Sequence, residues 1–293
     1  MKILFTLPGI HNPHGGYLNI LEIITELQKY HETVDLFVES KHLTPAWVGF
    51  EHIHITNNRK AFKNYDVIVI GSPHSIWIED MIAPHQRIIL HMQMIEELFR
   101  PGDMRWKALC YKFYGSKHFL ISTSKWGVRR TETTVGRSPE NSLFIQDGIN
   151  LARFPITRPT KDERTILLES PFSKNPAKDT ANYAYQVAKR FKWCRIIGYG
   201  AAPSPYPDVE YYQRPDNETL NRLYERAPIL IKATKYDFSS LAPLQAMTKG
   251  CVTARALNYG DDYLIHGETC LRSEYDREKL YENAAELLYS RLK

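Results

Sequence analysis

Short apolar runs alternate with stretches of helical periodicity along the whole chain, and this alternation restricts the fold more than any other feature. After the first apolar run, Ile20, Ile23, Ile24 and Leu27 follow the spacing of one helix face. Strands that alternate with amphipathic helices are typical of parallel βα units. The expected strands of the first half are Lys2–Leu7, Val34–Val38, Val67–Ile70, Arg87–Leu90, Phe119–Ser122 and Leu143–Ile145.

A second set of the same elements begins after Pro159, with apolar helix faces around Ala184 and Leu220. The expected strands of this half are Thr165–Leu168, Arg195–Ile197, Pro228–Ile231 and Cys251–Thr253. At 293 residues the chain is longer than a usual domain of roughly 100 to 200 residues. The polar, proline-bearing stretch Pro155–Arg164 lacks periodicity and is typical of a linker. We therefore expect an α/β protein with two doubly wound domains, residues 1–154 and 155–293.

The composition sets the broad class of the protein. Hydrophobic residues make up 43% of the chain and charged residues 24%, as in ordinary soluble proteins. No apolar run approaches the ~20 residues of a membrane-spanning helix, and the N-terminal run lacks the core and cleavage site of a signal peptide. We therefore expect a cytoplasmic protein without integral membrane association. The four cysteines form no Cys-x-x-Cys pair, which argues against a disulfide framework and a zinc site.

Ligands of a βα chain bind beyond the carboxyl ends of its strands, so the loops that follow strands are the candidate sites. Gly15 and Gly16 lie directly ahead of the first expected helix, where they either let a phosphate approach the backbone or simply form a tight turn. Their spacing is not Gly-x-Gly-x-x-Gly, which makes a dinucleotide-binding protein a poor interpretation. His74 and His91 also follow strands, and each either bonds a neighbouring carbonyl group or contacts a ligand.

The run Tyr236–Met247 combines a strand end, a loop and a helix N-terminus. The first N–H groups of a helix have no internal partner and lie at its positive end, so such a segment suits a diphosphate. Asp237 and Gln245 flank the helix start, and the amides near Ser239, Ser240 and Leu241 are the expected anion ligands.

This run resembles the donor-binding loop of the retaining, nucleotide-sugar-dependent glycosyltransferases of the GT-B fold, family 4 in particular. In that family a Glu, seven further residues and a second Glu precede Ala-Met, and this chain has Asp237 and Gln245 at the two Glu positions. The segment Phe119–Phe154 is similar to the junction between the domains of that family, with Asn150 where Asp is usual. After the strand that ends at Leu168, the family has an Arg and a Lys that bind phosphate; Ser170 stands at the Arg position here.

The resemblance implies two Rossmann-like domains that face each other across a cleft, the first on the acceptor side and the second binding the nucleotide sugar. The C-terminal helix, which Asp276 is expected to cap, can pack back on the first domain in such a fold. It implies a nucleotide-sugar donor and no further cofactor; Asp-x-Asp is absent, Asp261-Asp262 is interpreted as a turn, and no metal is expected. The implied catalytic residues are His91, Lys174 (with Lys178 as the fallback) and Asp237. The implied donor-binding residues are Gly15, Gly16, Gly198, Gln213, Ser239, Ser240, Leu241 and Gln245.

The acceptor is indicated by charge. The formal net charge is +5, and the segment 100–137 is rich in Lys and Arg interleaved with aromatic residues. Such a segment is a solvated helix face, a contact for an anionic membrane that carries a lipid or polysaccharide acceptor, or a contact for nucleic acid. We favour double-stranded DNA, because the size of the chain resembles that of bacteriophage enzymes that attach sugars to hydroxymethylated bases, which would place the protein in the host cytoplasm.

A second class of function, binding without catalysis, remains open. If Asp237, Gln245 and Ser170 are degenerate positions, the chain is a catalytically inactive relic that binds a nucleotide or a nucleic acid. Hydrolysis of a nucleotide sugar without acceptor separates the two interpretations.

Overall fold

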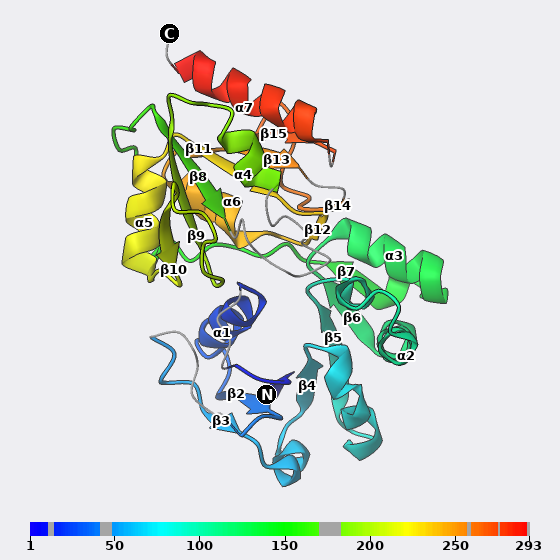
Figure 1. Ribbon diagram of the computed structural model, residues 1–293. Coiled ribbons are helices and arrows are strands. Elements are labelled where there is room, and N and C mark those ends of the chain that lie inside the picture. Colours follow the sequence, from blue (N-terminus) through cyan, green and yellow to red (C-terminus); the bar gives the residue numbers. More distant parts are fainter. Residues whose placement is uncertain (11–14, 42–48, 170–182, 257–258, 275, 292–293) are drawn as a thin grey trace. The chain divides into compact units, whose positions relative to one another are not determined.

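The computed structural model describes residues 1–10, 15–41, 49–169, 183–256, 259–274 and 276–291 (Figure 1). The chain divides into two compact units, Met1–Gln146 and Asp147–Lys293. Phe154, the last residue of the expected first domain, packs in the core of the second unit with Leu167 and Ile197. The linker residues that follow it belong to the second unit as well.

The first unit is built on a parallel sheet with the strand order β3-β2-β1-β4-β5-β6-β7. Its strands are β1 (Lys2–Leu7), β2 (Thr33–Val38), β3 (Ile55–Thr56), β4 (Val67–Ile70), β5 (Arg87–Met92), β6 (Phe119–Ser122) and β7 (Ser142–Phe144). Its helices are α1 (Gly15–Leu27), α2 (Met104–Gly115) and α3 (Lys125–Val135), with the 3-10 turns η1 (Arg59–Asn64), η2 (Pro73–Met81), η3 (Glu96–Phe99) and η4 (Pro139–Asn141).

The periodicity of α1 explains how this unit closes its core. Ile20 and Ile24 are fully buried and pack with Phe5, Leu36 and Val69 from three neighbouring strands. Each strand residue of this set alternates with a residue on the opposite face of the sheet, as the period of two requires. The helix predicted from the isoleucine spacing is therefore confirmed.

The second unit repeats the same strand order in a six-stranded parallel sheet, β10-β9-β8-β11-β13-β15. Its strands are β8 (Thr165–Glu169), β9 (Arg195–Gly200), β10 (Glu210–Gln213), β11 (Ile229–Ala233), β13 (Val252–Ala256) and β15 (Cys270–Ser273), and β12 (Tyr236–Asp237) pairs with β14 (Tyr259–Gly260) outside it. Its helices are α4 (Tyr183–Ala188), α5 (Asn217–Arg226), α6 (Leu241–Thr248) and α7 (Arg277–Arg291).

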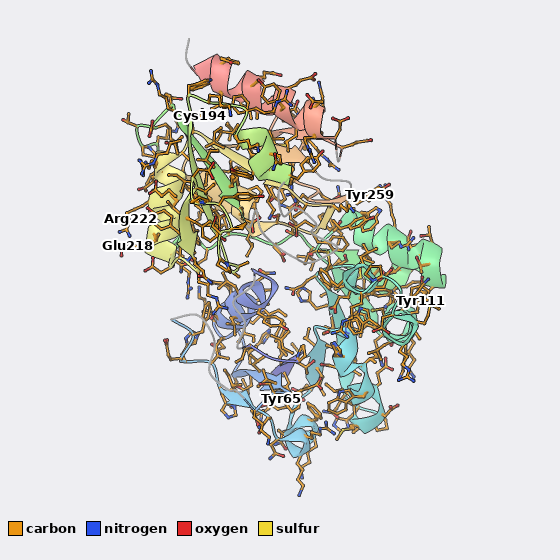
Figure 2. All side chains as sticks on the ribbon, viewed as in Figure 1. Tyr65, Tyr111, Cys194, Glu218, Arg222 and Tyr259 are labelled. Atoms are coloured by element: carbon orange, nitrogen blue, oxygen red, sulfur yellow. The ribbon has the colours of Figure 1, made fainter. Side chains whose placement is uncertain are left out.

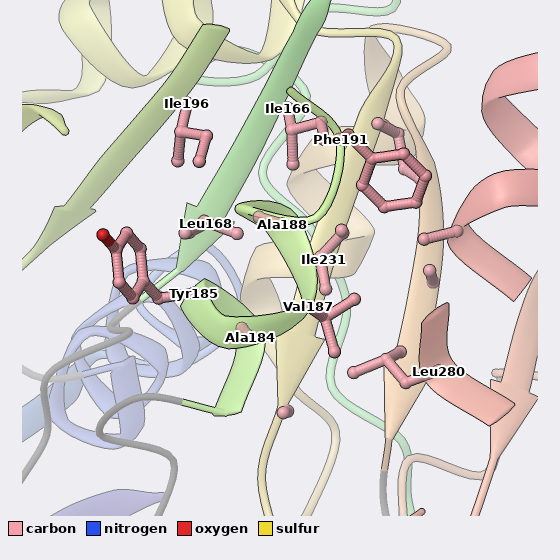
Figure 3. Packing of buried hydrophobic residues seen from close by; sticks show 14 of the residues in the cluster. Ile166, Leu168, Ala184, Tyr185, Val187, Ala188, Phe191, Ile196, Ile231 and Leu280 are labelled. Atoms are coloured by element: carbon pink, nitrogen blue, oxygen red, sulfur yellow. The ribbon is translucent and has the colours of Figure 1, made fainter. Parts of the chain in front are cut away.

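Helices cover both faces of this sheet (Figure 1). Ile166 and Leu168 of β8 pack with Val187 of α4 and Leu280 of α7, as Figure 3 shows. Leu167, the residue between them, faces α5 and α6 on the other side. α7 contacts β13, β15 and α4 of its own unit, and Asp276 caps it by accepting a bond from the N–H of Lys279 at 2.8 Å.

The order 3-2-1-4 of both sheets has a topological switch point, at which connections leave in opposite directions. It lies between β1 and β4 in the first unit and between β8 and β11 in the second. Ligands of doubly wound sheets bind outside the carboxyl ends of the strands at this point. The segments that follow β1, β4, β8 and β11 are therefore the first places to look for a site.

Candidate functional site

The loop between β11 and α6 brings four of the expected donor-site residues together: Asp237, Ser239, Ser240 and Leu241. Ser240 is the N-cap of α6, and its N–H donates to Asp261 Oδ1 at 2.6 Å. A carboxylate from the same unit therefore occupies one of the amides expected to bind phosphate. Pro243 has no N–H, so Leu241 and Ala242 are the first-turn residues whose amides by position lack an acceptor within the helix.

Asp237 is held between two cations rather than facing solvent. Its Oδ2 lies 3.1 Å from Lys232 Nζ and 3.4 Å from Arg255 Nη2, and it accepts a bond from Ser240 Oγ at 3.0 Å. Asp261 Oδ2 in turn pairs with Arg255 Nη2 at 2.8 Å. We call Lys232, Asp237, Arg255 and Asp261 the buried ion cluster, because each side chain is at most 10% exposed.

Electrostatics keep the two cations of the cluster charged despite their burial. Burial acts to lower the pKa of Lys232, but the carboxylates of Asp237 and Glu169 outweigh it and raise that pKa. Burial likewise opposes the charge of Arg255, and Asp261 and Asp237 raise its pKa nonetheless. Burial raises the pKa of Asp261, against the lowering influence of Arg255. The cluster fixes the loop in front of α6, and the adjacent pair Asp261-Asp262 is therefore more than a turn.

Two residues beside this edge have a backbone conformation that L-amino acids rarely adopt. Ser239 has φ +44 and Arg214, which follows β10, has φ +50. Ser239 Oγ accepts a hydrogen bond from the N–H of Asp147 at 2.9 Å. This bond ties the loop to the first residue of the second unit. Such strain is concentrated at functional sites.

Gln245 lies on α6 with its side chain in the interior of the second unit. Its Oε1 accepts a bond from Tyr224 OH at 3.0 Å, and Tyr224 OH lies 2.6 Å from Tyr199 OH. Gln245 is only 7% exposed, and in this arrangement it is the acceptor at the end of a buried tyrosine pair.

Gly198 lies inside β9 rather than at its end, because the strand continues to Gly200. A Cβ atom at Gly198 would lie 2.9 Å from the ring of Tyr211, so this glycine makes room for a neighbouring side chain. Gln213 is the last residue of β10 and is exposed; its Nε2 donates to the carbonyl oxygen of Ala201 at 3.1 Å.

In the first unit, Gly15 and Gly16 begin α1 directly after the switch-point strand β1. Gln93, just beyond β5, donates from Nε2 to the carbonyl oxygen of Gly16 at 2.9 Å. A Cβ atom at Gly16 would lie 2.8 Å from Gln93 Oε1, so this residue meets a side chain at close range. Gly16 thus ties the first turn of α1 to the segment just beyond β5.

His91 lies on β5 and is 6% exposed. Its Nδ1 has no hydrogen-bond partner within the described ranges, and burial lowers its pKa to about 4. The imidazole is therefore neutral at pH 7, so it can bond a hydroxyl group but supplies no positive charge. His74 packs against Trp106, with ring centroids 4.4 Å apart and the ring planes tilted by 35°. Burial, and to a lesser extent the charge of Arg100, lowers the pKa of His74.

The basic segment 100–137 is only partly a surface. Its exposed cations are Arg100, Arg105, Lys107, Lys112, Lys117, Lys125 and Arg129. Arg137 is buried: it donates to the carbonyl oxygens of Tyr114 and Ser116 at 2.8 and 2.7 Å, and to those of His118 and Asn141. The expectation that Arg137 belongs to an interaction surface is therefore wrong, because its guanidinium group is buried and hydrogen-bonded to backbone carbonyl groups.

Lys174, its fallback Lys178 and Ser170 lie outside the described residues. Within the part of the chain that is described, no group of three or more His, Cys, Asp or Glu side chains is arranged to hold a metal ion. In that same part, no helix has the length and apolar character needed to cross a bilayer.

Sequence reasoning missed the two cations of the buried ion cluster. Lys232 and Arg255 are register partners on β11 and β13, one residue before the end of each strand. A lysine and an arginine inside otherwise apolar runs were the available signal, since a charged residue in a buried strand needs a partner.

No family model and no curated protein matches the chain. Among solved structures, HepE from Anabaena in complex with UDP-glucose is 13% identical, covers 100% of this chain and 90% of its own, and superimposes with a TM-score of 0.75. An alpha-glucosyltransferase in complex with UDP and a 13-mer DNA containing a HMU base is 13% identical, with coverages of 100% and 91% and a TM-score of 0.67. WaaG, a glycosyltransferase involved in lipopolysaccharide biosynthesis, is 14% identical, with coverages of 99% and 91% and a TM-score of 0.66. Together with the two parallel sheets, these likenesses show that the chain has the GT-B fold, with two Rossmann-like domains.

Proposed function

We propose that the protein is a retaining glycosyltransferase that moves a sugar from a nucleotide-sugar donor to an acceptor hydroxyl group. The observation that carries the proposal is the likeness over the full chain to glycosyltransferases, among them HepE with UDP-glucose bound. The second support is the α6 N-terminus at the switch-point edge of the second sheet, where helix amides suit a diphosphate.

In the proposed reaction, the leaving nucleoside diphosphate is stabilised by the amides of Leu241 and Ala242 and by Lys174. These groups develop their interaction as negative charge moves onto the leaving oxygen, which is where electrostatic stabilisation lowers a barrier. The buried ion cluster orients the loop that presents the amides, with Asp237 as its central carboxylate. We propose that no metal ion takes part.

We assign the neutral imidazole of His91 to a hydroxyl group of the donor sugar. Gly15 and Gly16 allow the diphosphate to approach the start of α1, and the ends of β9 and β10, with Gln213, flank the nucleobase. Gln245 retains an acceptor oxygen for the ribose, as its amide can accept as well as donate.

The acceptor that we propose is a hydroxymethylated base in double-stranded DNA, in the cytoplasm of an infected cell. Seven exposed cations on and around α2 and α3 support it. Three of them lie over aromatic rings: Arg100 over Trp106 at 5.0 Å, and Lys107 over Tyr111 and Lys125 over Phe144 at 5.4 Å each. Tyr111 is labelled in Figure 2. One structure of the same fold contains DNA with a modified base.

A panel of nucleotide sugars, tested by mass spectrometry with plain and hydroxymethylated duplex DNA, examines the proposal directly. We expect a mass increase of one sugar on the modified duplex only, and a steep loss of DNA affinity as salt rises, because phosphate contacts release counterions. Lys174→Ala and His91→Ala should abolish transfer while leaving the protein folded. Wild-type transfer rates in both variants would remove these assignments.

A catalytically inactive relic is the second candidate, and one observation favours it. The Ser240 amide and the Asp237 carboxylate, both expected at the donor, are engaged within the protein. Tight binding of a nucleotide sugar without release of nucleoside diphosphate would support the relic. Transfer to a lipid or polysaccharide acceptor, in place of DNA, would instead align the protein with enzymes such as WaaG.

A further inference from the structure

We propose that Glu96 is the residue of the first unit that binds the acceptor hydroxyl group. The assignment rests on the proposed function and adds to it the residue that positions the acceptor. It depends on the place of Glu96 in the fold and on the way its backbone is held.

Glu96 lies beside the switch point of the first sheet. It begins η3, directly after β5, and its carboxyl oxygen Oε2 lies 3.4 Å from Oγ of Ser72, which follows β4. Tyr17 lies on the helix that follows β1. Burial raises the pKa of its phenol, and the nearby carboxylate of Glu96 raises it further. Segments from three neighbouring strands therefore meet at this carboxyl group, at the edge where such sheets bind ligands.

The main chain of Glu96 is fixed from two directions. Its N–H donates to Tyr114 OH at 2.8 Å, and its carbonyl oxygen accepts from Trp106 Nε1 at 2.8 Å. Both rings come from α2 and are buried. Tyr114 is itself fixed, because its hydroxyl group donates to Glu97 Oε2 at 2.6 Å. A backbone anchored by side chains at both polar groups is how proteins hold a functional side chain within a narrow range of positions.

The carboxyl group is suited to bind a neutral hydroxyl. Burial raises the pKa of Glu96 to about 8; Ser72 and Arg100 oppose the shift and Glu97 adds to it. A protonated carboxyl group has one O–H donor and a carbonyl acceptor, which matches the acceptor and donor of an alcohol. The other titratable groups around it are Tyr17 on α1, Cys110 and Tyr114 on α2, and Glu97 and Arg100 on η3.

Structural interactions alone do not account for the side chain. Glu97, its neighbour, is 8% exposed and is engaged by Tyr114 and, at 3.9 Å, by Arg130. Glu96 is part-buried, and within the described residues its side chain makes one hydrogen bond, the long contact with Ser72. Of the two neighbouring carboxyl groups, that of Glu96 is therefore the one with fewer interactions inside the protein.

The test compares Glu96→Ala, Glu96→Gln and, as a control on the exposed surface, Glu140→Gln. Two rates are measured from pH 6 to 9.5: sugar transfer to a duplex oligonucleotide with a hydroxymethylated pyrimidine, and donor hydrolysis without DNA. We expect Glu96→Ala to raise the acceptor KM about tenfold, the loss of one good hydrogen bond, with donor hydrolysis within about twofold of wild type. Glu96→Gln keeps a donor and an acceptor, so its KM should stay within about threefold of wild type.

The pH profile separates binding from a merely structural role. The wild-type acceptor KM should rise above about pH 8 as the carboxyl group ionises, whereas the Glu96→Gln KM should not. An unchanged acceptor KM in Glu96→Ala, or equal pH profiles of the wild type and Glu96→Gln, would overturn the assignment while the proposed function stands. A wild-type protein that neither hydrolyses a donor nor transfers sugar would overturn the proposed function and the assignment together.

Discussion

Replacing Asp261 should destabilise the second unit by several kilocalories per mole. Asp261 is completely buried, and it bonds Arg255 through Nη2 at 2.8 Å and Nε at 3.2 Å and the Ser240 N–H at 2.6 Å. Removing this carboxylate leaves the buried guanidinium of Arg255 without its nearest counter-ion. Deleting one partner of a buried ion pair costs about 3–5 kcal/mol. We therefore expect Asp261→Ala to lower the unfolding free energy of this unit by about 3–5 kcal/mol, a large share of the roughly 5–15 kcal/mol of a typical domain.

Two further variants divide this cost. Asp261→Asn keeps an oxygen for the Ser240 N–H, so it should retain about 1 kcal/mol relative to Asp261→Ala. Combining Asp261→Asn with Arg255→Met removes both charges, and the double variant should be more stable than Asp261→Asn alone, since a missing pair costs less than an orphaned charge. The exposed pair Glu218–Arg222 on α5, 2.6 Å apart and labelled in Figure 2, is the control: Arg222→Ala should change stability by less than about 0.5 kcal/mol.

Native-state hydrogen exchange of the β11 and β13 amides is the appropriate measurement, because it reports the opening of this unit without assuming that the two-unit chain unfolds in one step. Equal protection of these amides in the wild type and Asp261→Ala would refute the reasoning. So would strictly additive effects of the Asp261 and Arg255 changes.

Two other outcomes can be stated. Gly260→Ala should lower the unfolding free energy by at least about 3 kcal/mol or prevent folding, because φ is +120 and a Cβ atom would lie 1.3 Å from the Asp237 carbonyl oxygen. Gly250→Ala should lower it by only about 1–2 kcal/mol, because φ is +65 and the space around it is open. Similar melting temperatures of the two variants would contradict this difference. His91 has a pKa of about 4 in the folded state and 6.5 as a free group, so the unfolded chain binds the extra proton between these values and stability falls as pH drops through this window. Urea unfolding at pH 7 and pH 4 should therefore show a smaller acid loss in His91→Gln, and equal losses would contradict the burial of a neutral imidazole.

Much of the architecture could be predicted because both sheets are buried on two faces, which makes their strands continuous apolar runs. β1, β4 and β6 have the predicted bounds, while β15 was missed because Cys270–Ser273 is short and half polar. Strand ends were less predictable: β9 continues to Gly200, which moves Gly198 into the sheet.

The secondary structure of the candidate site could be predicted, but the partners of its side chains could not. The loop before α6 was evident from a strand followed by a helix start, yet the carboxylate that bonds the Ser240 amide comes from Asp261, which is distant in the chain. Likewise Arg137 looked like any other surface cation, and only the converging carbonyl groups show otherwise. Contacts of this kind depend on loop conformations that local patterns do not specify.

Arg137 links three stretches of backbone in the first unit. Its guanidinium bonds the end of α2, the approach to β6 and the turn η4 before β7, so these segments cannot separate while that group stays bound. The segments just before β6 and before β7, an edge strand of only three residues, Ser142–Phe144, are consequently coupled to the end of α2. The side chain of Arg137 thereby supplements the pairing of β7 with β6, which spans only three residues.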